Sequence, residues 1–192
     1  MILPILMVVM SNTPLVTIGG VNVKVEDAGK VVMASEWISE RNQKVSKATV
    51  DSLAAGVYLA SREFGLPMAT ILAVIYIECS GNPRAQHPYL PKYNTRARGP
   101  MGVVRRFHNI PKNVDLEDPI LGVLWGSKIL VMFMHDYGHN TGLYRYSGRT
   151  KGYVQKYYRL IRTMDDELFE YNGNDPGTKD TYKMCIKAIR RA

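Results

Sequence analysis

The stretch that decides the fold runs from Leu66 to Pro83 and reads LPMATILAVIYIECSGNP. Its first part is apolar at almost every position, which predicts a helix buried on all sides. Glu78 is the only charged residue of the stretch, and Ser80 and Gly81 follow it as residues that end a helix. Because burial penalises an ionised carboxylate, we expect Glu78 to keep its proton near neutral pH, as a general acid must.

Helical patterns continue on both sides of this stretch. Ser46 has the side chain of an N-cap and Gly65 is a typical C-terminal stop, so the segment between them predicts a helix. Asp118 followed by proline begins another, apolar pattern. This pattern predicts a helix at residues 119–137, and further helices are predicted for residues 141–146, 151–163 and 178–191. We therefore expect a mainly α domain at residues 46–164, followed at residues 165–192 by a polar loop and a basic helix.

The N-terminal part of the chain follows a different pattern. Residues 14–33 alternate apolar and polar side chains after a Gly19-Gly20 pair, which predicts a β-hairpin. Residues 34–47 predict a polar connector that carries Trp37 and Ile38, with a helical turn as the alternative. Residues 1–10 are apolar, but they are too few to span a bilayer as a helix and lack the basic start of a signal peptide. Residues 1–45 are therefore expected to form a small β appendage or anchoring segment, without a transmembrane span.

The charge of the chain favours an anionic partner. Its 192 residues carry a formal net charge of +8, which suits nucleic acid, a membrane surface or the anionic wall of bacteria. The basic residues are scattered and form no recognisable nucleic-acid-binding module, so specific nucleic-acid binding is the weakest of these interpretations.

The cysteines and histidines suggest neither a disulfide framework nor a cofactor. Cys79 and Cys185 are too few for a disulfide scaffold, and each lies in a helical pattern, so we expect two buried thiols rather than a bridge. His108, His135 and His139 have no acids or cysteines at metal-ligand spacing. Neither a metal nor another cofactor is therefore expected.

Four short motifs occur in an order that is more specific than any one of them. They are Glu78-Cys79-Ser80-Gly81-Asn82-Pro83, Ala97-Arg98-Gly99-Pro100-Met101-Gly102-Val103, Asp118-Pro119 with Gly126 and Leu130, and Tyr146-Ser147-Gly148. Together they resemble the motifs of the soluble lytic transglycosylases, lysozyme-like enzymes that cut peptidoglycan. The resemblance covers roughly residues 48–160.

This resemblance implies a lysozyme-like fold and a function. In such enzymes one carboxyl group protonates the glycosidic oxygen between N-acetylmuramic acid and N-acetylglucosamine, then takes the proton of the muramyl C6 hydroxyl as a 1,6-anhydro ring closes. In this chain the resemblance implies that Glu78 is the catalytic acid and base and that Tyr146 orients the Glu78 carboxyl group. Substrate-binding roles are expected for Ser80, His87, Met101, Gly102 and Ser147. Structural roles at the site are expected for Asn82, Pro83 and Gly99, and from the residues alone a structural role is also favoured for Ser80.

The sequence departs from the family pattern at several positions. Gly102 stands where the family has glutamine, Pro100 where it has leucine, and Ser147 where it has asparagine. The family commonly has Ser-Pro shortly after Asn-Pro, whereas this chain has His87-Pro88. The loop up to Ala97 is also longer than usual. These changes put individual sugar contacts in question while leaving Glu78 in place.

Alternatives to a lytic transglycosylase remain open. The chain could hydrolyse the same bond, as goose-type lysozymes do, or it could be a structural or adaptor protein of a virion that reuses the fold with weak or no activity. The small size and basic charge suit a bacteriophage enzyme carried in the virion for local penetration of the bacterial envelope. A periplasmic enzyme of a bacterial secretion complex would have the same features, and in either setting residues 1–45 would bind the larger assembly.

Overall fold

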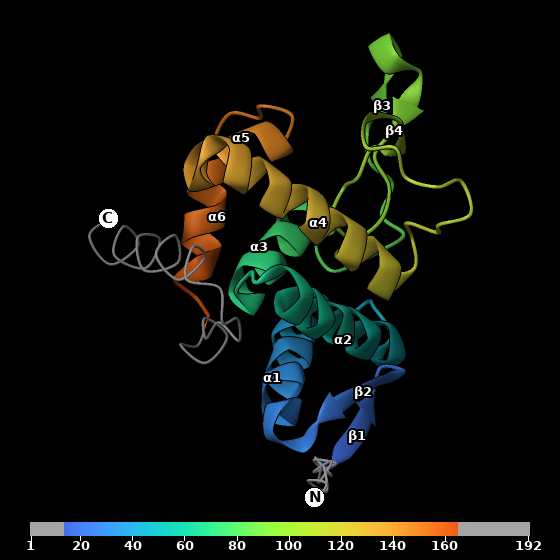
Figure 1. The fold of residues 1–192 in the computed structure, drawn as a ribbon, viewed down its shortest axis with the longest axis vertical. Coiled ribbons are helices and arrows are strands. Elements are labelled where there is room, and N and C mark those ends of the chain that lie inside the picture. Colours follow the sequence, from blue (N-terminus) through green and yellow to red (C-terminus); the bar gives the residue numbers. More distant parts are fainter. Residues whose placement is uncertain (1–13, 165–192) are drawn as a thin grey trace, which may run out of the picture.

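The structure is a computed structural model in which residues 14–164 are described. It is mainly helical, as the sequence predicts, with two short antiparallel hairpins (Figure 1). The helices are α1 (Val25–Arg41), α2 (Lys47–Phe64), α3 (Met68–Cys79), α4 (Pro119–Tyr137), α5 (His139–Tyr146) and α6 (Tyr153–Ile161). The strands are β1 (Leu15–Ile18), β2 (Val21–Lys24), β3 (Tyr89–Leu90) and β4 (Thr95–Arg96), and two 3-10 turns are η1 (Pro91–Tyr93) and η2 (Arg105–Phe107). The predictions for residues 1–10, 165–192 and Cys185 lie outside the described residues.

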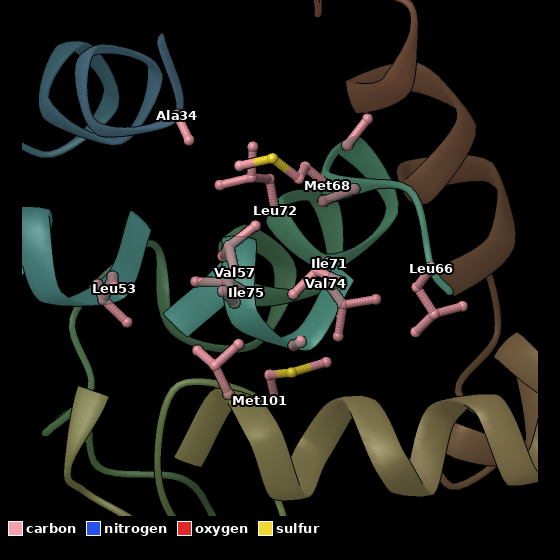
Figure 2. Close-up of a cluster of buried hydrophobic side chains, with 14 of the residues drawn as sticks. Ala34, Leu53, Val57, Leu66, Met68, Ile71, Leu72, Val74, Ile75 and Met101 are labelled. Carbon is pink, nitrogen blue, oxygen red and sulfur yellow. The ribbon is translucent and has the colours of Figure 1, made fainter. Parts of the chain in front are cut away.

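Helix α3 forms the centre of the core, which confirms the prediction from its apolar sequence. Figure 2 shows its side chains between those of the neighbouring elements. Ile71, Leu72, Val74 and Ile75 are all buried, and α3 contacts α1, α2, α4 and α6. A helix that is apolar all round is stable only where other elements cover every face, so α3 requires this arrangement.

Helix α1 corrects the prediction for the N-terminal segment. The alternation ends at Lys24, and Val25–Arg41 is a helix rather than the end of a hairpin and a polar connector. Its buried residues are Val31, Ala34, Ser35, Trp37 and Ile38, which recur at helical spacing and pack on α2 and α3. The prediction that this segment lies outside the helical body is therefore wrong, although the hairpin before it is confirmed.

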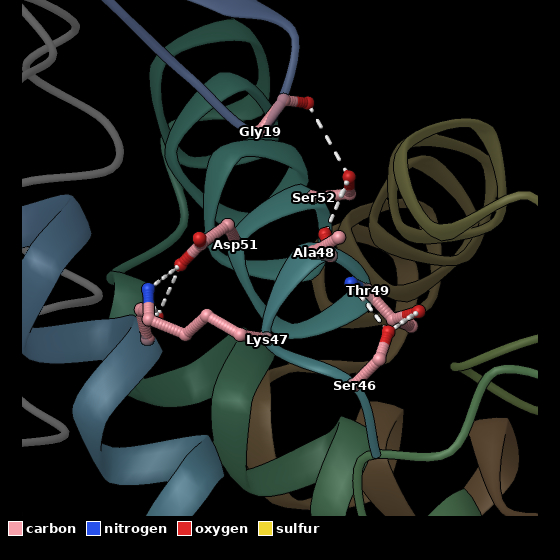
Figure 3. A network of polar contacts seen from close by, with 8 residues as sticks. Gly19, Ser46, Lys47, Ala48, Thr49, Asp51 and Ser52 are labelled. Atoms are coloured by element: carbon pink, nitrogen blue, oxygen red, sulfur yellow. Dashed lines mark hydrogen bonds and ion pairs between the residues drawn. The ribbon is translucent and has the colours of Figure 1, made fainter.

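The β1–β2 hairpin is fixed to the start of α2 (Figure 3). Gly19, with a φ of 58°, lies directly over the α2 backbone, where a Cβ would come within 2.5 Å of the carbonyl carbon of Asp51. The Ser52 hydroxyl is 3.4 Å from the Gly19 carbonyl oxygen, to which it donates. Asp51 also accepts a hydrogen bond of 2.6 Å from Ser35 of α1, so the hairpin, α1 and α2 meet at one place.

The predicted ends of the two long helices are confirmed. Ser46 caps α2 by accepting a hydrogen bond from the Thr49 amide, and Gly65 ends it with a φ of 67°. Asp118 caps α4 by accepting from the amides of Ile120 and Leu121. None of the helices in residues 14–164 combines the length and apolar character needed to cross a membrane.

Candidate active site

Glu78 lies in the last turn of α3, and the residues after it form a tight turn. Ser80 ends the helix in the left-handed conformation, with a φ of 52°, and Gly81 follows at 79°. The Asn82 side chain accepts a hydrogen bond of 3.1 Å from the Arg84 amide, which is the turn-forming role expected for asparagine. Ser80 and Asn82 therefore shape the backbone beside Glu78.

Helix α1 supports this turn from outside. The Asn42 side chain, just past the end of α1, donates a hydrogen bond of 2.7 Å to the Ser80 carbonyl. Gly81 is buried against Ile38, whose methyl group would lie 3.0 Å from a Cβ at that position. The backbone that follows Glu78 is thus held by a helix that the sequence did not reveal.

A second tight turn, at residues 98–103, reaches the Glu78 carboxyl group. Arg98 and Val103 exchange two backbone hydrogen bonds of 2.9 Å, and the turn between them contains Gly99 and Gly102 at positive φ. A Cβ on Gly102 would overlap Glu78 Oε2 and lie 2.9 Å from its Cδ. The backbone of Gly102 therefore lies directly against the carboxyl group, and no side chain fits there without displacing it.

Helix α4 holds this turn through two glycines one helical turn apart. A Cβ on Gly122 would come within 2.5 Å of the Pro100 ring, and one on Gly126 would come within 2.7 Å of the Met101 sulfur. Met101 is completely buried, and its sulfur lies 3.4 Å from the Ser127 hydroxyl. Met101 is therefore part of the core beneath Gly102, and its side chain does not reach a surface that a substrate could touch.

Two tyrosines lie near Glu78, and their hydroxyl groups donate hydrogen bonds to different acceptors. The Tyr153 hydroxyl donates a hydrogen bond of 2.8 Å to Glu78 Oε1. The Tyr146 hydroxyl donates one of 2.6 Å to the Met101 carbonyl instead. The residue that orients the carboxyl group directly is thus Tyr153, which the sequence predicts only as part of a helix. Tyr146 fixes the turn that bears Gly102.

The environment of Glu78 changes its acidity. Burial raises the pKa of Glu78 from 4.5 to about 7, and the hydrogen bond from Tyr153 opposes part of this rise. Near neutral pH the carboxyl group is therefore divided between its protonated and ionised forms. A group in this state can both donate and accept a proton, which general acid–base catalysis requires. The neighbouring Cys79 thiol is buried and its pKa is raised to about 12, so it is not a nucleophile at neutral pH.

Two of the predicted substrate contacts have structural partners in this chain. His87 is buried, and its Nε2 lies 3.1 Å from the Gly99 carbonyl oxygen. The Ser147 hydroxyl donates to the Tyr144 carbonyl at 2.8 Å and accepts from the Thr150 amide at 3.1 Å. These contacts place His87 under the turn at residues 98–103 and Ser147 in the turn after α5, and neither contact involves Glu78.

A separate groove of about 400 Å³ lies between α2 and α4. It is lined by Leu59, Glu63, Phe64, Leu124, Trp125 and Lys128. None of the predicted site residues belongs to it. Within the described part of the chain, no group of three acids, histidines or cysteines is placed to hold a metal ion.

The structure thus brings together Glu78, Gly102, Tyr146 and Tyr153, with Met101 beneath them. Comparisons of the chain with models of protein families, with curated proteins and with solved structures gave no match.

Tyr153→Phe is expected to move the pH dependence of activity upward. The hydrogen bond from Tyr153 lowers the pKa of Glu78, so its loss raises that pKa above about 7. With peptidoglycan as the substrate, as the sequence motifs imply, the alkaline limb of the rate should shift to higher pH, because it follows the loss of the Glu78 proton. The maximal rate should fall by about tenfold because the carboxyl is less well oriented. Rates at low substrate concentration between pH 5 and 9 measure both effects.

Tyr146→Phe is the matched control for this prediction. It removes a phenolic hydroxyl that donates to the Met101 carbonyl and leaves the Tyr153 hydrogen bond in place. The alkaline limb of its rate–pH profile should lie at the same pH as in the parent protein, whatever its maximal rate. An equal shift in both variants, or no shift in Tyr153→Phe, would show that Tyr153 does not set the acidity of Glu78.

Proposed function

We propose that the chain is a lysozyme-like enzyme that cleaves the β-1,4 bond between N-acetylmuramic acid and N-acetylglucosamine in peptidoglycan and forms 1,6-anhydromuramyl ends. The observation that carries this proposal is the single carboxyl group of Glu78, with a pKa of about 7 and a hydrogen bond from Tyr153. The four motifs that resemble lytic transglycosylases give the substrate class.

The reaction needs one proton donor that later becomes an acceptor. Glu78 gives its proton to the glycosidic oxygen as the bond to the muramyl C1 breaks. The muramyl C6 hydroxyl then attacks C1 and gives its proton to Glu78, which restores the enzyme without consuming water. A pKa near neutrality suits both halves of this cycle, since neither protonation state is strongly favoured.

The carboxylates near the start of α4 support a mechanism with one acid. Asp118 caps α4, Glu117 forms an ion pair of 2.9 Å with Arg98, and Asp115 accepts from the Glu117 amide. The pKa of Glu78 is shifted by burial and by Tyr153, with no contribution from a second carboxylate of the described residues. Most glycosidases use two carboxyl groups about 5 to 10 Å apart. A mechanism with one acid, in which the C6 hydroxyl of the substrate is the nucleophile, fits these contacts better than a mechanism with two carboxyl groups.

The test is the chemistry of the products. Purified peptidoglycan is digested with the wild-type chain, and the released muropeptides are analysed by mass spectrometry. Muropeptides with 1,6-anhydromuramyl ends, which are one water lighter than reducing products, are expected. A known muramidase on the same substrate supplies the reducing ends for comparison.

Two other results would overturn the proposal in different ways. Reducing muramyl ends would show a hydrolase that uses water, as in goose-type lysozymes. No release, where the control muramidase digests the same substrate, would favour a binding or structural protein. We also propose a setting, that of a virion enzyme acting in the bacterial envelope. This setting depends on the release of muropeptides with 1,6-anhydromuramyl ends.

A further inference from the structure

The hairpin of β3 and β4 projects from the helical body (Figure 1). Aromatic side chains of this hairpin and of the chain that follows it are exposed. We call residues 89–107 the arm. Tyr89, Tyr93 and Phe107 are 46%, 39% and 48% exposed. Large aromatic side chains gathered at a surface, outside any core, are typical of binding sites.

The aromatic side chains of the arm are held in place. The Tyr93 and Phe107 rings pack edge to face, with centroids 5.0 Å apart. Arg106 donates a hydrogen bond of 2.8 Å to the Tyr93 carbonyl, and the Tyr89 hydroxyl donates to the side chain of Asn94. The arm therefore presents a preformed surface, which lowers the entropy cost of binding.

The charged residues of the arm itself are all basic. Residues 84–114 contain no aspartate or glutamate. The Lys92 ammonium lies 5.4 Å from the centre of the Tyr93 ring, and the Arg96 guanidinium 5.8 Å from that of Tyr89. Neither cation has a carboxylate partner among the described residues, whereas Arg98 is paired with Glu117. The rings of the arm are thus combined with cations available for an anionic ligand.

The arm is connected to the surroundings of Glu78 at two places. Its first strand, β3, follows the turn at residues 80–85. Its second strand, β4, leads into the turn at residues 98–103, which is part of the arm and whose Gly102 touches the Glu78 carboxyl group. A polymer that crosses Glu78 would therefore have the arm nearby. Sugar rings stack on the faces of aromatic side chains, and carboxylates pair with lysine and arginine.

We propose that the arm is a second binding surface for peptidoglycan, outside the bond that is cut. The aromatic rings of Tyr89, Tyr93 and Phe107 contact the sugars, and Lys92 and Arg96 bind the carboxylates of the stem peptides. This inference rests on the proposed function, because it takes the polymer to be the one that Glu78 cleaves.

The test measures binding in a chain that cannot cut. A Glu78→Gln protein is mixed with insoluble peptidoglycan sacculi, and the fraction that sediments gives an apparent dissociation constant. Adding Tyr89→Ala and Tyr93→Ala should weaken binding by about tenfold, as expected for the loss of central aromatic contacts. Adding Lys92→Gln and Arg96→Gln should weaken it severalfold at low salt and less at high salt.

Matched controls come from α4 and α6, outside the arm. Tyr137 is 42% exposed, and the Arg145 guanidinium lies 3.9 Å from its ring centre, so Tyr137→Ala removes a similar aromatic group. Lys156→Gln with Arg159→Gln removes two exposed charges of α6. All control proteins should bind as the parent does. Thermal melting of each protein shows that the fold is retained.

Removal of the stem peptides identifies the carboxylate contact. Sacculi treated with an amidase should bind the parent more weakly, and on them the charge variants should no longer differ from it. Equal loss in arm and control variants, unchanged binding of the arm variants, or tighter binding of single-stranded DNA than of sacculi would overturn the inference. If the wild-type chain cuts peptidoglycan while the arm variants of the Glu78→Gln protein bind sacculi normally, only this inference fails. If the wild-type chain releases no product, the proposed function fails by its own test.

Discussion

Glu78→Gln should lower peptidoglycan cleavage by at least about a thousandfold, because the amide can neither donate nor accept the required proton. The substitution keeps the shape of the side chain, so the Tyr153 hydroxyl can still donate to its oxygen. Release of soluble muropeptides by purified protein, followed over time, measures the effect. An activity within tenfold of the parent would show that Glu78 is not the catalytic acid.

The same substitution should change stability in a pH-dependent way. The pKa of Glu78 is about 7 in the folded chain, against 4.5 ordinarily, so between these values the folded chain holds a proton that the unfolded chain has lost. The free energy of unfolding of the parent therefore decreases as pH rises through this window, by roughly 3 to 4 kcal/mol in all, at about 1.4 kcal/mol per pH unit. Glutamine has no charge to bury, so Glu78→Gln should be more stable than the parent at pH 8.

Denaturant unfolding of both proteins at pH 4 and pH 8 measures this difference. At pH 4 the carboxyl is protonated in both the folded and the unfolded parent, so the two proteins should have similar stability. A stability difference of equal size at both pH values would mean that the ionisation of Glu78 is not responsible.

Gly102→Ala should reduce cleavage by about a hundredfold, because displacement of a catalytic group by about 1 Å has effects of this size. The new Cβ would overlap Glu78 Oε2 and force the carboxyl group away from Tyr153. The left-handed φ of 62° is also unfavourable for alanine, and the free energy of unfolding should fall by about 1 to 3 kcal/mol. The cleavage rate and denaturant unfolding of the same preparation give both values.

Gly20→Ala separates the effect of the overlap with Glu78 from the effect of the unfavourable backbone conformation. Gly20 has a φ of 83°, and a Cβ there would meet nothing within 4 Å. This variant should lose stability because of its backbone conformation but retain the cleavage rate of the parent. If Gly102→Ala were no less active than Gly20→Ala, the close contact with Glu78 would have no catalytic importance.

The parts of the fold that the sequence predicts are those that depend on local signals. The apolar run of α3 requires burial on every face, and Ser46 and Asp118 begin their helices by capping them. Gly19-Gly20 and the alternation after it predict the first hairpin. In each case neighbouring residues in the chain determine the structure, so no distant contact is needed to infer it.

Helix α1 was missed because its first residues extend a strand pattern. Val25 continues the alternation of Val21 and Val23, and β-branched residues favour strands where nothing else decides. The helical spacing of Val31, Ala34 and Ile38 was the signal that could have revealed it. Contacts with α2 and α3, which are not local, favour the helix.

The role of Tyr153 could not be inferred from spacing. Several tyrosines follow α4, and the sequence does not show whether the phenol of Tyr146 or that of Tyr153 reaches Glu78. The turn between them, which contains Gly148 and Gly152 at positive φ, decides which one points to the carboxyl group. The sequence marks that turn by its glycines but does not give its path.

The position of α1 also decides where a shortened version of this protein can begin. A boundary at residue 46, which the helical pattern would recommend, removes Ile38 and Asn42 from the turn behind Glu78. It also uncovers apolar faces of α2 and α3 that are now in contact with α1. Any truncated protein intended for crystallisation or for fusion to another domain should therefore keep the chain from Val25 onward.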